Sequence, residues 1–313
     1  MNFLSTMEQS PLSSLFPKGW DLARIDACCT LPPESIAERQ EFWHSRFTPK
    51  CCDDAAAMDV MMGLSVAEIV RRTRDEGRPL ALLLPEGPAG MYRWLVYYLR
   101  QWDVSCAHVH VFGICEWSDK DGSEPEPEEA ISFHRALYAQ FLEPLGALGV
   151  PAGQRNFATQ HGLPKYAQKI ADVKAQGGMV VMVYGIGRMM NIAFWEASLA
   201  AGFTSEEEWK AQYYRKAVSL HVLTVEQHAL ERFSGRTTLV PCFANTIGPG
   251  IFLQCDYAIG CAGAGGLLWQ GSALWTTLRY GPSVWVPSSF MPTLPGRLYY
   301  TRELTGPLGI HGV

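Results

Sequence analysis

The sequence lacks the features that would place the chain in a membrane or on a nucleic acid. No apolar run approaches the ~18 residues that a transmembrane helix requires. The N-terminus has no basic stretch followed by an apolar one, so it does not resemble a signal peptide. Lysine and arginine form no basic run, and the formal net charge is −5. We therefore expect a cytoplasmic protein with neither a membrane nor a nucleic-acid partner.

Cysteine and glycine patterns typical of metal or nucleotide sites are also missing. Nine cysteines are an odd number for a disulfide framework, and so long a chain does not need one. The pairs Cys28-Cys29 and Cys51-Cys52 are vicinal, whereas zinc sites use C-x2-C spacing, so ordinary thiols are favoured over metal ligands. The glycine-rich stretch Gly260–Gly266 has no following Lys-Ser/Thr, so it is not a P-loop. We expect neither a metal nor a cofactor.

The chain does contain a regular alternation of short apolar runs with longer amphipathic stretches. Its composition, 48% hydrophobic and 18% charged, is ordinary for a globular protein. The alternation predicts an α/β fold, a three-layer sandwich in which a mainly parallel, Rossmann-like sheet carries helices on both faces. The expected strands are Pro79–Leu84, His108–Phe112, Met179–Tyr184, Tyr257–Gly260 and Ser283–Pro287. The expected helices are Ser65–Asp75, Met91–Gln101, Ile131–Leu142, Tyr166–Gln176, Ser205–Leu220, Thr224–Phe233 and Leu267–Leu278.

The first 60 residues differ from the rest of the chain. Several prolines interrupt them, and one helix is expected at Pro33–Phe47, because proline suits a first helical turn and Glu34 favours its positive end. Alternation begins only near residue 64, where Ser65 and Glu68 form a capping box. We therefore expect an N-terminal extension over residues 1–60 and one α/β domain over residues 61–313.

Two turns follow apolar runs and carry most of the functional information. The first is Leu84-Pro85-Glu86-Gly87-Pro88-Ala89-Gly90-Met91-Tyr92, and the second runs from Gly185 to Glu196 as GIGRMMNIAFWE. Together they resemble the glucosamine-6-phosphate deaminase/isomerase and 6-phosphogluconolactonase family. The resemblance covers roughly residues 64–300 and implies a phosphosugar-isomerase fold, a carbohydrate ligand bound at the carboxyl ends of the strands, and a homo-oligomer.

The first turn departs from the family pattern. It is two residues shorter than P-T-G-S-T-P-L-G-M-Y, it lacks the Ser-Thr pair that would contact phosphate, and Glu86 stands where the family has Thr. A carboxylate beside a phosphate costs affinity, so the ligand is expected to be unphosphorylated or to hold its phosphate elsewhere. Glu86, Gly87 and Gly90 are candidate ligand-binding residues. The alternative is a compact strand–helix connection whose glycines serve tight geometry.

Cys115-Glu116-Trp117 falls where the resembling family has D-E-Y, whose Asp is an acid/base group. A thiol cannot simply replace that carboxylate, because its reference pKa is ~8.5 rather than ~3.9. Cys115 is either a small buried residue or a nucleophile with a base nearby. Glu116 keeps the second acidic position, and Trp117 is a candidate ligand contact.

The second turn keeps its glycines, Gly187 among them, and Glu196, but it loses the family's Asp, Gly and His, which have become Met189, Met190 and Asn191. An amide does not exchange a proton near pH 7 as imidazole does, although Asn191 can still hydrogen-bond a sugar. Trp195 adds an apolar surface. The alternative is that the matching residues of this turn serve packing alone, within a buried strand–turn–helix crossover.

Arg232 falls where the family has a phosphate-binding arginine, and Gly271 falls where it has a phosphate-binding lysine. A lone arginine on a helix is also a common surface residue. The resemblance implies an isomerase, deaminase or lactone hydrolase acting on a sugar derivative, with Glu116, Glu196 and Cys115 as candidate catalytic groups. A non-catalytic sugar-binding or regulatory protein that kept the fold is the alternative. We expect the Glu116 and Glu196 carboxylates to face one pocket.

Overall fold

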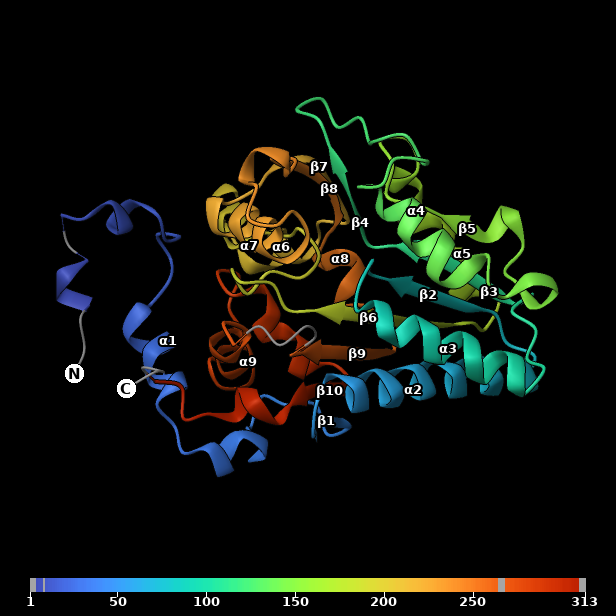
Figure 1. Ribbon diagram of the computed structural model, residues 1–313, viewed down its shortest axis with the longest axis horizontal. Helices are drawn as coiled ribbons and strands as arrows, with labels where there is room; N and C mark the ends of the chain where they lie inside the picture. Colours follow the sequence, from blue (N-terminus) through green and yellow to red (C-terminus); the bar gives the residue numbers. More distant parts are fainter. Residues whose placement is uncertain (1–3, 8, 264–267, 310–313) are drawn as a thin grey trace.

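The computed structural model describes residues 4–7, 9–263 and 268–309 and is built on a seven-stranded sheet in the order β1-β10-β9-β6-β2-β3-β5 (Figure 1). Every neighbouring pair in this sheet is parallel, which confirms the α/β class expected from the sequence. Its strands are β1 (Phe47–Cys52), β2 (Leu80–Leu84), β3 (Val109–Gly113), β5 (Arg155–Asn156), β6 (Met179–Gly185), β9 (Tyr257–Ala262) and β10 (Gly296–Thr301).

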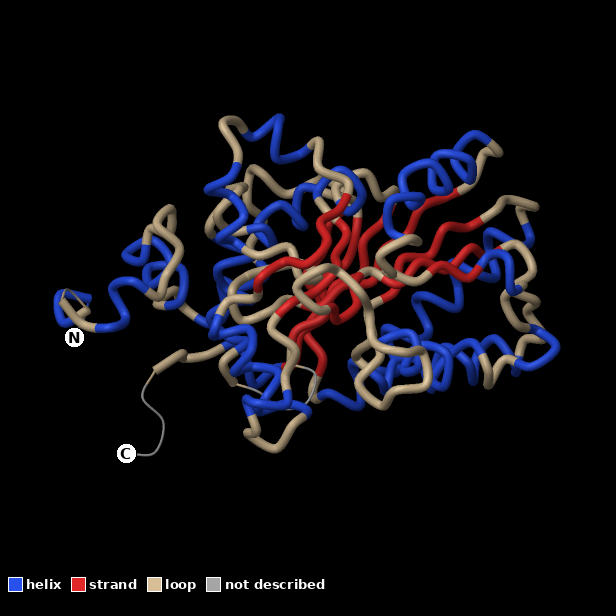
Figure 2. Tube along the Cα trace, turned by 90° about the horizontal axis from the view of Figure 1, so that it is seen from above, coloured by secondary structure: helices blue, strands red, loops and turns tan. Residues whose placement is uncertain are grey.

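The continuous apolar run of β2 reflects burial on both faces of the sheet. Leu80, Leu82 and Leu84 belong to one core, whereas Ala81 and Leu83 point to the other, because side chains alternate along a strand. Helices cover both faces, and Figure 2 shows the strands as a layer between them. The first core contains residues of α2 (Ala55–Asp75) and α3 (Ala89–Gln101), and the second contains residues of α5 (Tyr166–Ala175), α8 (Pro249–Phe252) and α9 (Gln270–Arg279).

The strand order reverses between β2 and β6. From β2 the chain adds β3 and then β5 on one side, and it returns to add β6, β9 and β10 on the other. The connections that leave β2 and β6 therefore diverge and open a crevice at the carboxyl ends of these two strands. Both turns that were singled out in the sequence, Pro85–Gly90 and Gly185–Glu196, leave these strands.

A second, antiparallel sheet begins with β4, the strand that follows β3 in the chain. It contains β4 (Cys115–Ser118), β8 (Phe243–Ile247) and β7 (Tyr214–Ser219), and α4 (Phe133–Leu137) and α7 (Val222–Arg232) contribute to its core. The prediction of a helix over Ser205–Leu220 is correct only for its first turn. Only α6 (Glu206–Lys210) is helical, because the polar residues that follow pair with β8 as an edge strand.

The N-terminal segment contributes to the main sheet, which corrects two expectations. The helix expected at Pro33–Phe47 ends after a short 3-10 turn, and β1 begins at its last residue because it pairs with β10 at the sheet edge. Helix α2 begins at Ala55 rather than Ser65, with the Asp54 side chain accepting a hydrogen bond from the Ala57 N–H. The expected domain boundary at residue 60 therefore falls inside α2. Before β1, α1 (Leu22–Cys29) packs on α9.

Two other expected elements, a strand near the C-terminal end and a helix in the middle of the chain, differ in the structure. The strand expected at Ser283–Pro287 is only an isolated bridge followed by a 3-10 helix, and the strand that pairs with β9 on this side of the sheet is β10 instead. The helix expected at Ile131–Leu142 divides into α4 and a π-helical turn over Tyr138–Leu142. The first residue of the helix expected at Leu267–Leu278 lies outside the described residues, and α9 follows from Gln270.

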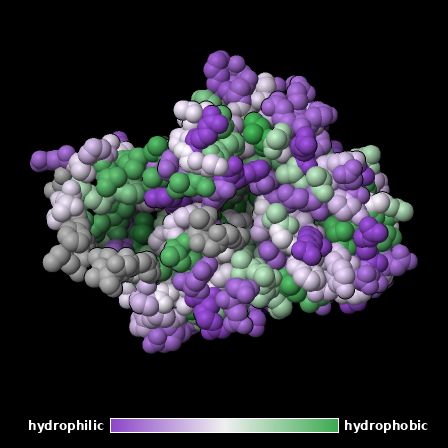
Figure 3. Space-filling model, viewed as in Figure 1, coloured by the Kyte–Doolittle hydropathy of each residue, from purple (hydrophilic) through white to green (hydrophobic). Residues whose placement is uncertain are grey.

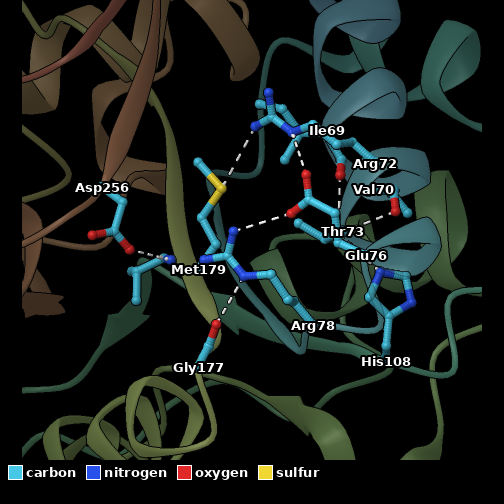
Figure 4. Close-up of polar contacts among 11 residues, drawn as sticks. Ile69, Val70, Arg72, Thr73, Glu76, Arg78, His108, Gly177, Met179 and Asp256 are labelled. Atoms are coloured by element: carbon cyan, nitrogen blue, oxygen red, sulfur yellow. Dashed lines mark hydrogen bonds and ion pairs between the residues drawn. The ribbon is translucent and has the colours of Figure 1, made fainter.

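Polar contacts join several elements at the amino ends of the strands, the end of the sheet opposite the crevice (Figure 4). Thr73 near the end of α2 bonds His108 Nε2 at 3.0 Å, and Arg78 donates to the Gly177 carbonyl at 2.9 Å. The Asp256 carboxylate accepts from the Val180 N–H at 2.8 Å. These bonds connect α2 and the segments that precede β2, β3, β6 and β9 at the amino ends of the strands.

None of the described helices is long and apolar enough to span a membrane. Hydrophilic side chains cover most of the face shown in Figure 3. Hydrophobic side chains gather on the left of this view, the side on which the N-terminal segment lies in Figure 1. Leu12 and Leu31 of that segment are among the exposed large hydrophobic residues, at 46% and 38% exposure.

Candidate active site

A cavity of about 610 Å³ opens at the carboxyl ends of β2 and β6, where the strand order reverses. This volume lies within the range of roughly 300–1,000 Å³ that is typical of small-molecule sites. Its walls come from the Pro85–Gly90 turn, the loop after β6, the end of α7, and the first turn of α2. The cavity therefore lies at the end of the sheet where the parallel-strand pattern predicts a ligand site.

Seven residues that the sequence pointed to line this cavity together. They come from the turn after β2, from the start of β4, from the loop after β6, and from α7. These residues are Glu86, Gly87, Gly90, Cys115, Gly187, Asn191 and Arg232. The described lining does not include Glu116, Trp117, Trp195 or Glu196.

The Glu116 carboxylate points away from the cavity and caps α4. It accepts hydrogen bonds from the N–H groups of Trp117, Phe133 and His134 at 2.8 to 3.0 Å, and from the Ser132 hydroxyl at 3.2 Å. Burial raises its pKa, although these donors oppose the rise. The expectation that Glu116 shares a pocket with Glu196 is wrong, because Glu116 satisfies the otherwise orphaned N–H groups of a helix end.

Glu196 and the two tryptophans are also part of the packing. Glu196 is fully buried below the loop, and burial raises its pKa to about 7 against the smaller effects of Thr224 and the His221 N–H. Trp117 packs between Phe133 and other rings of the smaller core, and Trp195 packs against Trp209. The Gly185–Glu196 segment is a loop after β6 rather than a strand–turn–helix crossover, and a short 3-10 helix follows it.

Glu86 and Arg232 form an ion pair across the cavity. Arg232 Nη1 lies 2.9 Å from Glu86 Oε1, and both side chains are largely buried, at 27% and 21% exposure. Burial raises the pKa of Glu86, and the guanidinium opposes that rise. Arg232 is the only lysine or arginine among the described residues that line the cavity. The cation expected to meet a phosphate is therefore already neutralised by a residue of the protein.

Asp59 occupies the other feature that could attract an anion, the positive end of α3. Its carboxylate lies so close to Gly90, in the first turn of α3, that a Cβ there would come within 1.8 Å of Asp59 Oδ2. No side chain caps this helix end, and burial raises the pKa of Asp59. The glycine is needed at this position because of the close approach of that carboxylate.

Glu231, next to Arg232 on α7, is a third carboxyl group in the cavity wall. Burial is the main cause that raises its pKa to about 7, and the charge of Glu86 adds to it. Gln227 Nε2 donates to its two oxygens at 3.2 and 3.4 Å, and Arg232 also opposes the rise. A carboxyl group with a pKa near neutrality can serve as a general acid or base at physiological pH.

Asn191 places an unused acceptor at the cavity wall. Its Nδ2 donates to the Ala193 carbonyl at 2.6 Å, which orients the amide, and its Oδ1 has no hydrogen-bond partner among the described residues. The side chain is only 4% exposed. Gly187 makes room for it, because a Cβ at that position would lie 2.2 Å from Asn191 Oδ1. A buried acceptor without a partner costs free energy unless a ligand donates to it.

Two further groups in the wall are poor proton carriers at neutral pH. Burial, followed by the nearby Glu116 and Glu86, raises the pKa of the Cys115 thiol well above its usual range, which works against a thiolate nucleophile. Burial lowers the pKa of His228 to about 4, and the Arg232 charge adds to this effect. His228 is therefore neutral, and its ring lies against Trp117 and Phe194.

Five charged or polar groups of the wall were missed in the sequence, namely Asp59, Gln227, His228, Glu231 and Gln270. The spacing Gln227, His228, Glu231, Arg232 on one helix face was a usable signal, because residues three and four apart lie side by side. No sequence signal pointed to Asp59, because the expected helix began at Ser65 and the true start of α2 at Ala55 was not recognised. Within the part of the chain that the structure describes, no group of three or more His, Cys, Asp and Glu is placed to hold a metal ion.

The chain resembles several known proteins. No protein-family model matches it. The curated glucosamine-6-phosphate deaminase of Serratia proteamaculans (strain 568) is 26% identical over 184 residues, which span 57% of this chain and 62% of that relative. The match thus covers less than two thirds of the relative's length.

Two solved structures are similar in fold. A monomeric glucosamine-6-phosphate deaminase superposes with a TM-score of 0.66 at 16% identity, covering 84% of this chain and 99% of that one. A 6-phosphogluconolactonase from Shewanella baltica OS155 superposes with a TM-score of 0.54 at 12% identity, covering 83% and 99%. Fold and cavity define a Rossmann-like α/β protein with a cavity at the reversal of its strand order. The chain shares the fold of these two structures, and its sequence is similar to that of a glucosamine-6-phosphate deaminase, in agreement with the resemblance of the two turns.

Proposed function

We propose that this protein binds an unphosphorylated sugar or sugar derivative in the cavity and catalyses a proton-transfer reaction on it. The reaction classes that the family resemblance supports are isomerisation, deamination and lactone hydrolysis. The observation that carries the proposal is the Glu231 carboxyl group, which lines the cavity beside the Glu86–Arg232 ion pair with a pKa of about 7.

The charges around the cavity favour a ligand without a phosphate. Three carboxyl groups, of Asp59, Glu86 and Glu231, face one guanidinium group, and Glu86 already holds it. Two like charges ~4 Å apart repel by ~4 kcal/mol at an effective dielectric constant of 20. A phosphate would have to displace Glu86 from Arg232 and remain beside it.

The remaining groups suit a polyhydroxylated molecule. Glu231 would exchange the proton, and Glu86, whose ionisation Arg232 favours and burial opposes, would accept a hydrogen bond from a hydroxyl or amine. Asn191 Oδ1 would accept a second hydrogen bond, which relieves an unpaired buried acceptor. The rings of Phe133 and Phe194 supply an apolar wall against which a sugar ring can lie.

A ligand screen followed by one isosteric substitution tests this proposal. Free sugars, amino sugars and sugar lactones are compared with their phosphates by thermal shift, because a ligand that binds the native state raises its apparent stability. The best ligand is then assayed for turnover by the parent and by Glu231→Gln. We expect binding by both proteins and turnover by the parent alone. Equal turnover in Glu231→Gln would refute the role of Glu231.

A second candidate function is sugar binding without catalysis. It is favoured by the structural roles of Glu116 and Glu196 and by the amide at Asn191, which cannot carry a proton. In that case the screen yields a ligand that raises the melting temperature, and neither the parent nor Glu231→Gln converts it.

We also propose that the protein forms a homo-oligomer and that the part of the N-terminal segment before β1 is an addition to the α/β domain. Exposed leucines on that segment support an interface there. Sedimentation of the full chain and of a variant with Leu12→Ser and Leu31→Ser tests this: loss of the oligomer is expected, and a parent chain that sediments as a monomer would contradict it.

A further inference from the structure

We infer that Gln227 is the positioning residue of the site: it holds the Glu231 carboxyl group in the cavity and sets its protonation by donating a hydrogen bond to it. The catalytic meaning of this role rests on the proposed function of Glu231. The effect on the protonation of Glu231 does not, because it follows from the hydrogen bonds alone.

The orientation of the Gln227 amide is fixed by a group that can only donate. The Arg188 backbone N–H lies 2.9 Å from Gln227 Oε1, so the carbonyl end of the amide must face the loop after β6. The Nε2 end must then face the other way, where it meets both oxygens of Glu231 at 3.2 and 3.4 Å. Gln227 is 8% exposed, so water is largely excluded as a replacement partner.

A donor in this place favours the ionised form of Glu231. The charged groups around Glu231 act in both directions: Glu86, from the turn after β2, opposes ionisation, and Arg232, on the same helix, favours it. His228, also on α7, is neutral near pH 7 because burial lowers its pKa to about 4. Burial and the Glu86 charge raise the pKa of Glu231, and the Gln227 amide counteracts both. Together with Arg232, the amide holds this pKa at about 7 rather than higher.

The same side chain connects the two polar parts of the cavity. Arg188 follows Gly187, and the loop returns to Asn191, whose carbonyl accepts from the Gly187 N–H at 3.2 Å. Gln227 thus joins the loop that holds the Asn191 acceptor to the helix that holds Glu231. Gln227 therefore links the position of the Asn191 acceptor, which would bind the ligand, to the position of the Glu231 carboxyl group, which would bind the proton.

The test is a pH titration of the Glu231 carboxyl group by infrared spectroscopy of the full chain, with the Glu231→Gln variant identifying its band. In Gln227→Leu the donor is lost, and we expect the titration midpoint to rise by about one pH unit. A folded Gln227→Leu protein with an unchanged or lower midpoint overturns the inference. A purely structural role for Gln227 would lower thermal stability without moving the midpoint.

A second variant covers the case in which Gln227→Leu fails to fold because the Arg188 N–H loses its acceptor. Gln227→Glu keeps that acceptor but replaces the donor with a carboxyl group. We expect the last proton of the resulting carboxyl pair to leave at a higher pH than in the parent, and an unchanged titration contradicts the inference. Because no turnover is measured, a shifted midpoint in a protein that converts no sugar would support this inference and refute the proposed enzymatic function.

Discussion

Arg232 Nη1 at the end of α7 lies 2.9 Å from Glu86 Oε1 in the turn after β2, so the guanidinium group of the cavity has an internal counter-ion. A second carboxylate, that of Asp59, lies against the first turn of α3. Both features that could bind an anion are thus occupied by acidic side chains of the protein itself.

Removing the Glu86 charge should admit a phosphate. We expect the parent to bind a free sugar more tightly than its phosphate, and Glu86→Gln to reverse or remove that preference, because Arg232 is released and the repulsion falls. Paired calorimetric titrations of the two ligands measure this. The exposed Glu143→Gln is the matched control. A parent that prefers the phosphate, with no change in Glu86→Gln, would show that this ion pair is not an electrostatic filter.

The protein should have no useful glucosamine-6-phosphate deaminase activity. Cys115, Met189 and Asn191 stand where the resembling family has its acid/base groups, and such groups contribute ~10²–10⁴-fold each. Ammonia release from glucosamine 6-phosphate, followed by a coupled assay, is expected to stay well below ~1 s⁻¹. Turnover at or above that rate would contradict both this prediction and the electrostatic argument against a phosphate.

The Glu116→Ala substitution should destabilise the fold while leaving the cavity wall in place. It deprives the N–H groups of Trp117, Phe133 and His134 of their acceptor, and we expect a loss of about 3 kcal/mol in the free energy of unfolding. Denaturant unfolding measures this loss. Glu143→Ala, on the surface, should stay within about 0.5 kcal/mol. A similarly small effect in Glu116→Ala would mean that the cap is not required.

Glu196 should make the stability depend on pH. Its pKa rises from 4.5 to about 7 on folding, so its contribution is fully present below 4.5 and is lost as the pH rises through about 7. The cost of keeping it buried reaches about 3 kcal/mol above pH 7. Glu196→Gln should therefore be more stable relative to the parent at pH 8 than at pH 4.5. The difference between the two unfolding curves checks this, and a difference that is the same at both pH values would be inconsistent with a protonated Glu196.

Gly187→Ala should weaken ligand binding by about tenfold or more, because its Cβ would displace the Asn191 amide from 2.2 Å away. Gly153→Ala is the control, since nothing lies within 4 Å of a Cβ at that position. The dissociation constant of the best ligand from the screen is the measurement. An unchanged constant in a folded Gly187→Ala protein would exclude Asn191 from the site.

The sequence by itself determined the class of fold and the end of the sheet at which the cavity lies. The run Leu80–Leu84 is apolar on both faces of a strand, and the turns after β2 and β6 carry glycines where the chain must turn sharply, so local pattern was enough. The same turns were enough to indicate the family. Alternation failed at β7 and β1, because their polar edge strands obtain their structure from pairing with distant segments rather than from their own periodicity.

Only the tertiary structure decided which carboxyl groups face the cavity. Glu116 lies in β4 and Glu196 in the segment after β6, yet the first caps α4 and the second is fully buried. Glu231, on a helix far along the chain, reaches the cavity because α7 packs beside the turn after β2, and Arg232 meets Glu86 for the same reason. Strand order fixes where a site lies, but the direction of each side chain depends on long-range packing and on which buried N–H groups need an acceptor.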